Sequence, residues 1–153
     1  MRWIVGLLML CLATASACAT PLPDGGVTAQ EVADVLQHAG YKAEITQDKY
    51  GDPLIKSASS GVNFSVYFYT CKNSPRCTSI QFYAGFQKPG IALERVAEWN
   101  RTTRFGKVYL DQDGDPRIEM DMDVEHGANT EALKNDLDRW VAVLAAFVKY
   151  IGW

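Results

Sequence analysis

Residues 62–70 read VNFSVYFYT, and this stretch decides the fold class. Apolar and polar side chains alternate along it without interruption, which is the pattern of a strand with one buried and one open face. One face would carry Val62, Phe64, Val66, Phe68 and Thr70, and the other Asn63, Ser65, Tyr67 and Tyr69. Such alternation is typical of an antiparallel sheet that is covered on one side only.

Extended segments surround this strand on both sides. Similar patterns predict strands at about 43–46, 53–57, 78–84, 108–110 and 118–124. Helical spacing predicts helices at about 29–39, 91–102 and 130–150. The expected order is therefore α-β-β-β-β-α-β-β-α, an α+β fold with a single antiparallel sheet packed by helices.

The helix ends carry recognisable signals. Thr28 and Glu31 are spaced as a capping box, and Asn129 or Thr130 can cap the last helix. In the last helix a broad apolar stripe should face the sheet: Leu133, Leu137, Trp140, Val141, Leu144, Phe147, Val148 and Ile151. In the middle helix the spacing turns these residues inward: Leu93, Val96, Ala97 and Trp99 or Asn100.

The N-terminus has the composition of a secretory signal. Arg2 precedes an apolar run that ends at Ala13, and small residues lead to Ala19. We therefore expect a signal peptide at 1–19, cleaved near Ala19, a flexible lead-in at 20–26 and one domain at 27–153, exported to the periplasm. The alternative is a lipoprotein anchored at Cys18, although Ala15 stands where that signal prefers a bulky aliphatic residue. No later apolar run reaches the ~20 residues of a membrane span.

Charge and cysteines narrow the functional classes. The formal net charge is −3, and removal of Arg2 with the leader makes it more negative. This argues against nucleic acid and anionic membranes as partners. In an oxidising compartment, Cys71 and Cys77 should form a disulfide across a hairpin tip. Because the loop is short, we expect it to contribute about 2 kcal/mol or less.

An acidic turn offers the sharpest ligand motif. Asp111, Asp113 and Asp115 match the opening of a calcium loop. However, Pro116 stands where that loop needs glycine and Met122 where it needs a bidentate glutamate, so a hairpin tip without metal is the simpler interpretation. The acidic positions from 119 to 125 are likewise expected to be a solvent face. The tripeptide Gly-Asp-Pro occurs at both 51–53 and 114–116, each time before a strand.

No catalytic or cofactor motif emerges from the sequence. The two histidines, His38 and His126, are far apart and lack a neighbouring nucleophile, and glycine-rich phosphate loops are absent. We therefore expect neither an enzyme nor a cofactor. A second cluster could bind a carboxylate through its arginines: Trp99, Asn100, Arg101 and Arg104. The alternative is that Trp99 is core, Asn100 bonds backbone, and the arginines pair with local acids.

The run LERVAEWNRTTRFGKVYLDQDGDP at 93–116 resembles the YbjN family of bacterial proteins, which are described as sensory transduction regulators. The Trp-Asn pair, the Arg-Phe-Gly and the Leu-Asp-x-Asp-Gly-Asp-Pro carry the resemblance, which extends loosely over 27–151. It implies a fold like that of type III secretion chaperones, which bind partner polypeptides and often form dimers. It implies no catalytic residues.

Two functional hypotheses follow. The first is an exported, non-enzymatic binding module that holds a polypeptide or a second copy of itself, by the last helix or by sheet aromatics: Tyr67, Tyr69, and Phe82 or Tyr83. The alternative is a periplasmic ligand- or cation-responsive sensor. It would use the three aspartates of the acidic turn, with Glu119 or the arginines near Trp99 as further ligands.

Overall fold

A computed structural model describes residues 19–71 and 74–153. The expected signal peptide, apart from Ala19, and the alternative anchor Cys18 lie outside the described residues. Residues 20–25 are hydrogen-bonded to the loop before the last helix. The Leu22 N–H donates to the Ala128 carbonyl at 2.9 Å, and the Gly25 N–H donates to the Glu125 carbonyl at 2.9 Å.

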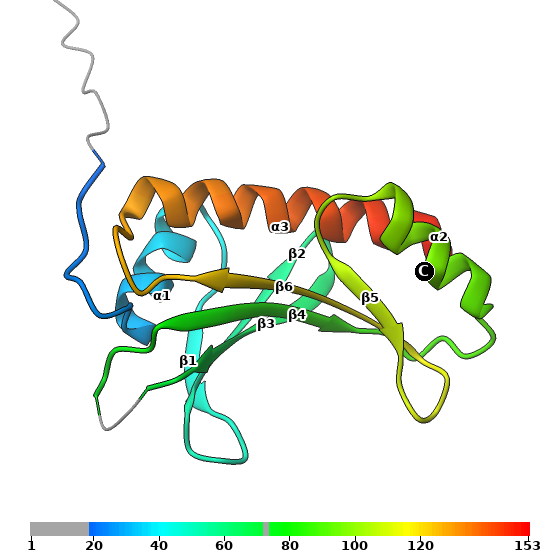
Figure 1. The fold of residues 1–153 in the computed structure, drawn as a ribbon, viewed down its shortest axis with the longest axis horizontal. Helices are drawn as coiled ribbons and strands as arrows, with labels where there is room; N and C mark the ends of the chain where they lie inside the picture. Colours follow the sequence, from blue (N-terminus) through cyan, green and yellow to red (C-terminus); the bar gives the residue numbers. More distant parts are fainter. Residues whose placement is uncertain (1–18, 72–73) are drawn as a thin grey trace, which may run out of the picture.

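Three helices and six strands follow the predicted order (Figure 1). In chain order they are α1 (Ala29–His38), β1 (Glu44–Gln47), β2 (Pro53–Ser59), β3 (Val62–Tyr69), β4 (Ser79–Gly85), α2 (Leu93–Thr102), β5 (Lys107–Leu110), β6 (Pro116–Asp123) and α3 (Thr130–Ile151). The strands form one antiparallel sheet in the order β1-β2-β3-β4-β6-β5. The α+β fold class is confirmed.

The register of the sheet separates its two faces. Ile55, Val66, Phe82 and Met120 lie in one row across the central strands and are buried on the inner face. The adjacent row turns to the opposite, outer face: Leu54, Tyr67, Gln81 and Asp121. The expectation that Thr70 continues the inner face is wrong. The strand ends at Tyr69, and Thr70 adopts a left-handed φ of 58° and is exposed as the chain turns into the cysteine loop.

The core lies between the inner face and α3. Trp140 of α3 is fully buried, stacks on Phe82 with ring centroids 5.6 Å apart, and meets the ring of Phe64 edge-on at 6.0 Å. Figure 1 shows α3 running along the whole sheet, with α1 on the same side. Truncating a buried tryptophan to alanine typically costs about 3–5 kcal/mol, so Trp140 is a main determinant of stability.

The predicted caps form. The Glu31 N–H donates to Thr28 Oγ1 at 3.2 Å, and the Thr28 N–H donates to Glu31 Oε2 at 2.8 Å, which is the reciprocal capping box. At α3 the cap is Asn129, whose Oδ1 accepts from the Ala132 N–H at 2.8 Å. Gly152 ends this helix with a left-handed φ of 66°.

The middle helix differs from its prediction. Trp99 is buried, but Leu93 is 68% exposed and Ala97 is also exposed, so these two do not face the core. The reason is position: α2 lies at the β5 edge of the sheet rather than over its inner face (Figure 1), and it therefore needs a narrower apolar stripe. Gly106 lies in the turn from α2 into β5. A side chain would not fit there, because a Cβ would lie 2.6 Å from Val143 Cγ1.

Among the described residues, none of the helices is both long enough and apolar enough to cross a membrane.

Candidate functional site on the outer face of the sheet

Three tyrosines in contact occupy the outer face. The ring of Tyr67 lies 6.5 Å from that of Tyr69 in a stacked arrangement and 5.7 Å from that of Tyr83 edge-on. Tyr69 is 42% exposed. Of the two neighbours proposed from the sequence, Tyr83 belongs to this tyrosine cluster, whereas Phe82 is buried beneath it. No described helix covers this face (Figure 1), so the cluster is an aromatic surface open to a partner.

Hydrogen bonds fix the Tyr69 side chain of the cluster. The Tyr69 hydroxyl donates to Gln81 Oε1 at 3.2 Å, and Gln81 Nε2 donates to Asp121 Oδ1 at 2.7 Å. Burial, followed by nearby acidic groups, raises the pKa of Tyr69 above its ordinary value, and burial also raises the pKa of Tyr83. Both hydroxyls therefore stay protonated and can act as donors near neutral pH.

A hydrogen-bonded triad lies beside the cluster and consists of Lys107 and Tyr109 on β5 and Glu119 on β6. The Tyr109 hydroxyl donates a hydrogen bond to Glu119 Oε1 at 2.6 Å, and Lys107 Nζ lies 2.8 Å from Glu119 Oε2. Burial and the Glu119 hydrogen bond raise the pKa of Tyr109, and that hydrogen bond likewise raises the pKa of Lys107. The expectation that Glu119 is part of a solvent face is wrong, because its cross-strand neighbours bury it. Asp121 and Asp123 are exposed as expected.

The two Gly-Asp-Pro turns have the same structure. In the β1–β2 turn, Asp48 Oδ1 accepts from the N–H groups of Tyr50 at 2.8 Å and Asp52 at 3.0 Å. In the β5–β6 turn, Asp111 Oδ1 accepts from the corresponding residues, Asp113 at 3.0 Å and Asp115 at 2.9 Å. The sequence D-x-x-G-D-P thus specifies one turn twice, with the side chain of the first aspartate closing it.

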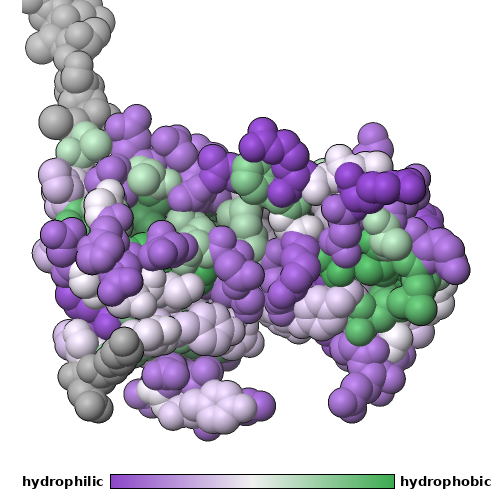
Figure 2. Space-filling model, viewed as in Figure 1, coloured by the Kyte–Doolittle hydropathy of each residue, from purple (hydrophilic) through white to green (hydrophobic). Residues whose placement is uncertain are grey.

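These turns stand at opposite edges of the sheet. Figure 1 shows the β1–β2 turn in cyan and the β5–β6 turn in yellow, both projecting to the side away from α3. Figure 2 shows the notch that lies between the two projections. The outer face is therefore recessed between two equivalent turns.

The acidic turn is occupied by its own contacts. The Asp111 carboxylate accepts the two turn N–H groups and pairs with the Arg117 guanidinium, whose Nη2 is also 4.0 Å from Asp115. The hydrogen bond from the Asp115 N–H is the main cause that lowers the pKa of Asp111. Asp113 is exposed. Within residues 19–71 and 74–153, no three acidic, histidine or cysteine side chains are arranged to hold a metal ion.

Asn100 closes the free edge of the sheet. Strand β5 is the last strand on its side, and its Val108 N–H and C=O point away from β6. Asn100 Oδ1 accepts from the Val108 N–H, and Asn100 Nδ2 donates to the Val108 carbonyl, both at 2.9 Å. Trp99 next to it is core and donates from Nε1 to the Gly106 carbonyl at 2.9 Å. The Trp-Asn pair therefore joins α2 to β5.

The two arginines of this cluster remain exposed. Neither Arg101 nor Arg104 has a carboxylate within 4.0 Å in the described part of the chain, so the expected pairing with local acids is wrong. The Arg104 guanidinium instead lies 5.2 Å from the ring of Phe105, which the Arg139 guanidinium also approaches at 4.7 Å. The structure does not bring the arginines together with the acidic turn's carboxylates as one site.

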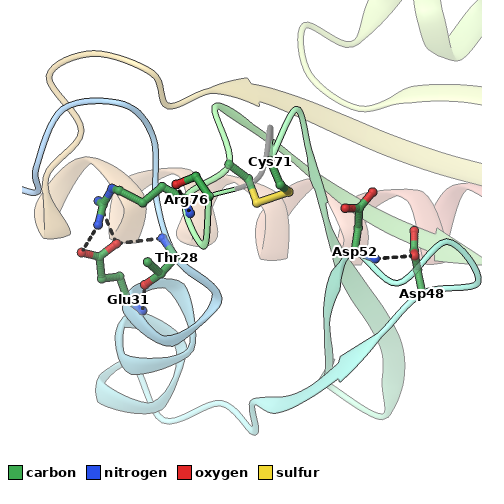
Figure 3. Close-up of a disulfide and its surroundings, with 8 residues drawn as sticks. Thr28, Glu31, Asp48, Asp52, Cys71 and Arg76 are labelled. Atoms are coloured by element: carbon green, nitrogen blue, oxygen red, sulfur yellow. Dashed lines mark hydrogen bonds and ion pairs between the residues drawn. A yellow bond between two sulfur atoms is a disulfide. The ribbon is translucent and has the colours of Figure 1, made fainter.

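The disulfide joins Cys71 to Cys77 as predicted (Figure 3). Cys77 is fully buried, and its backbone forms an isolated β-bridge with Val27. Next to it, Arg76 reaches the N-terminal segment in a way the sequence did not reveal. It donates to the Gly26 carbonyl at 2.6 Å and to both carboxylate oxygens of Glu31, at 3.0 and 3.1 Å. The cysteine loop thus fastens the lead-in and α1 to the sheet.

The exposed apolar residues of the last helix are small alanine side chains, among them Ala142, Ala145 and Ala146. Its half-buried aliphatic residues, Val141, Val143 and Val148, pack against the core. Of the two surfaces suggested by the sequence, the outer face of the sheet is the one that exposes aromatic side chains.

These features define an α+β domain with a single sheet, one face of which is covered and the other open and aromatic. A family model described as "Putative bacterial sensory transduction regulator", YbjN, matches residues 28–153. The chain belongs to the YbjN family. No protein of curated function and no solved structure matches it. The likeness to type III secretion chaperones therefore stays a prediction.

Proposed function

We propose that this chain is an exported, non-enzymatic regulatory module that holds a polypeptide segment on the outer face of its sheet. The observation that carries the proposal is the tyrosine cluster, in which the ring of Tyr67 contacts those of Tyr69 and Tyr83 on a face that no described helix covers. Tyrosine supplies a large contact area and a hydroxyl at low cost in side-chain entropy, and it is enriched in protein interfaces. Membership of a family of regulators agrees with this role.

The shape of the face favours an extended or rod-like segment. The face is recessed between the two projecting turns, which a broad globular partner would meet before it reached the tyrosines (Figures 1 and 2). A single strand or helix can lie between them. Membership of the family does not say which partner is bound, so we infer the form of the partner from the recess.

Export is proposed on independent grounds. The first residues have the composition of a secretory signal, and the disulfide is a bond that persists in oxidising compartments. Mass spectrometry of the protein from its native cells tests this part. We expect a mature N-terminus near residue 20 and no free thiol at Cys71 or Cys77. An intact leader with both thiols reduced would contradict it.

Peptide selection tests the binding role. Peptides from a random library displayed on phage are selected on the immobilised protein, and their affinities are then measured by fluorescence anisotropy. We expect selected peptides to lose about tenfold or more in affinity for Tyr67→Ala, because that ring contacts both of its neighbours. Tyr50→Ala is the matched control, since Tyr50 is 78% exposed and lies outside the cluster.

Two outcomes would contradict the binding role. Peptides that bind the wild type and Tyr67→Ala equally would place the site elsewhere, and failure to select any peptide would argue against a peptide-binding face. Light scattering on the same samples reports self-association. A dimer that Tyr67→Ala dissociates would assign the face to a second copy of the chain instead.

A further inference from the structure

We propose that one end of the outer face is a carboxylate-binding subsite, so that the polypeptide held there carries acidic residues at the corresponding end. This inference rests on the proposed function and names the chemistry of its partner. The subsite is a hollow of about 600 Å³ lined by residues of β2, β3, β4 and β6, with Glu44 of β1 and the preceding Lys42. Its charged lining residues are Lys42, Lys56, Arg117 and Glu44. Three of these four residues are cations, although the chain as a whole has a net charge of −3.

Arg117 supplies ordered N–H donors to the hollow, while its charge is paired with Asp111. It lies flat against Gly85, where a Cβ would come within 2.6 Å of Nη1, so the absence of a side chain there makes room for the guanidinium. Nη1 donates to the Phe86 carbonyl at 3.1 Å, and Nη2 pairs with Asp111. These contacts use two of the five N–H donors of a guanidinium, and its planar geometry suits a further carboxylate. Because the side chain is already ordered, binding costs little additional entropy.

Lys42 and Lys56 supply charges that the fold does not neutralise. Both are exposed, and neither lies within 4.0 Å of a carboxylate in the described residues, although Glu44 is opposite Lys56 in the strand register. By contrast, two other cations of the same face are paired, Lys107 with Glu119 and Arg117 with Asp111. Lys42 and Lys56 are therefore the cations of the hollow that remain free to pair with a bound carboxylate.

The rest of the face argues for an acidic polypeptide rather than a nucleic acid. Tyr83 lines the hollow and also belongs to the tyrosine cluster, so one bound segment can contact both. Beyond the cluster, the β6 end of the face carries Asp121 and Asp123, which would repel a uniform polyanion. The face thus fits a segment with carboxylates at one end and apolar side chains after them.

Three synthetic peptides test the inference. One carries a run of glutamates ahead of alternating apolar and polar residues, the second has glutamines in place of the glutamates, and the third has lysines. Affinities are measured by anisotropy at low and at physiological salt with the full chain, with the Lys42→Ala/Lys56→Ala variant, and with Lys149→Ala. Lys149 is an exposed lysine in the last turn of α3 and serves as the control.

We expect the glutamate peptide to bind the wild type and Lys149→Ala about tenfold more tightly than the glutamine peptide at low salt, and by a smaller factor at physiological salt. In the double variant this preference should largely disappear, while the glutamine peptide binds as before. Because both lysines are exposed, the variant should keep the wild-type circular dichroism spectrum, which is recorded as a check.

The alternative outcomes separate this inference from the proposed function. Equal binding of the glutamate and glutamine peptides, with loss of both in Tyr67→Ala, would overturn the subsite and leave the binding face intact. Preference for the lysine peptide, or tighter binding of a single-stranded oligonucleotide than of the glutamate peptide, would also overturn it. Failure of all three peptides to bind the wild type would overturn the subsite. The role of the face would then depend on the peptide selection.

Discussion

Replacing Asn100 with alanine removes both hydrogen bonds that close the free edge of β5. The side chain acts as a substitute for a neighbouring strand, because it accepts from the Val108 N–H and donates to the Val108 carbonyl. Without it, the two backbone groups depend on water, and the edge becomes available to other strands. The contact is local, so the remainder of the fold should form normally.

The magnitude follows from the two contacts. Each is 2.9 Å long, and a hydrogen bond of this kind contributes about 0.5–1.5 kcal/mol net. Because Asn100 is exposed at the surface, water replaces part of what is lost, and we expect a decrease of about 1–2 kcal/mol in the free energy of unfolding. In a domain of this size, that corresponds to a fall of roughly 3–8 °C in Tm.

Urea unfolding followed by tryptophan fluorescence measures the stability, and amide hydrogen exchange measures the protection of Val108. Arg101→Ala is the matched control, since Arg101 is the exposed neighbour on the same helix and forms no ion pair in the described residues. The reasoning is refuted if Asn100→Ala unfolds at the control's urea concentration and its Val108 amide exchanges at the wild-type rate.

Three further predictions concern stability. Ser57 has a buried hydroxyl with no partner in the described residues, so Ser57→Ala should raise the free energy of unfolding by about 1 kcal/mol in urea titration; no gain would show that the hydroxyl is satisfied. Reducing the disulfide should cost about 2 kcal/mol and increase hydrogen exchange at Val27, and unchanged exchange there would contradict the proposed fastening. Burial raises the pKa of Glu31, but the Thr28 backbone and Arg76 outweigh it and hold the pKa below its ordinary 4.5. Stability should therefore be lost as the pH falls below that value, and less so in Arg76→Ala; equal pH dependence by thermal melting would argue against the ion pair.

The local sequence pattern was sufficient to predict the strands and most helix ends. The alternation at 62–70 depends only on which side chains are apolar, and the strand runs from Val62 to Tyr69 as a result. The capping box at Thr28 and the repeated Gly-Asp-Pro turns are likewise local, since their hydrogen bonds join residues two to four positions apart. Such features depend on residues that are close together in the sequence, so they can be recognised from it.

Features that depend on strand register were not predictable. The sequence left open whether Phe82 or Tyr83 faces outward, and pairing with Val66 and Ser65 on β3 settles the choice. The outward direction of Glu119 was correctly predicted from alternation, but its burial depends on a lysine and a tyrosine from the adjacent strand.

Tertiary position explains the remaining differences. Leu93 and Ala97 have the spacing of a buried stripe, yet α2 lies at the edge of the sheet, where Trp99 is buried and Val96 is half-buried against the core. The contact between Arg76 and Glu31 spans 45 residues and involves an arginine in a loop without regular pattern. The one available hint was Glu31 itself, because a capping carboxylate has a second oxygen that can accept another donor.

The most direct test of the binding face is a nuclear magnetic resonance titration of the labelled protein with the glutamate peptide. Our account predicts that the ring signals of Tyr67 and Tyr83 and the amide signals of β2, β3 and β4 shift together, while those along α3 stay in place. Shifts confined to α2 or α3, with the tyrosine signals unmoved, would contradict it.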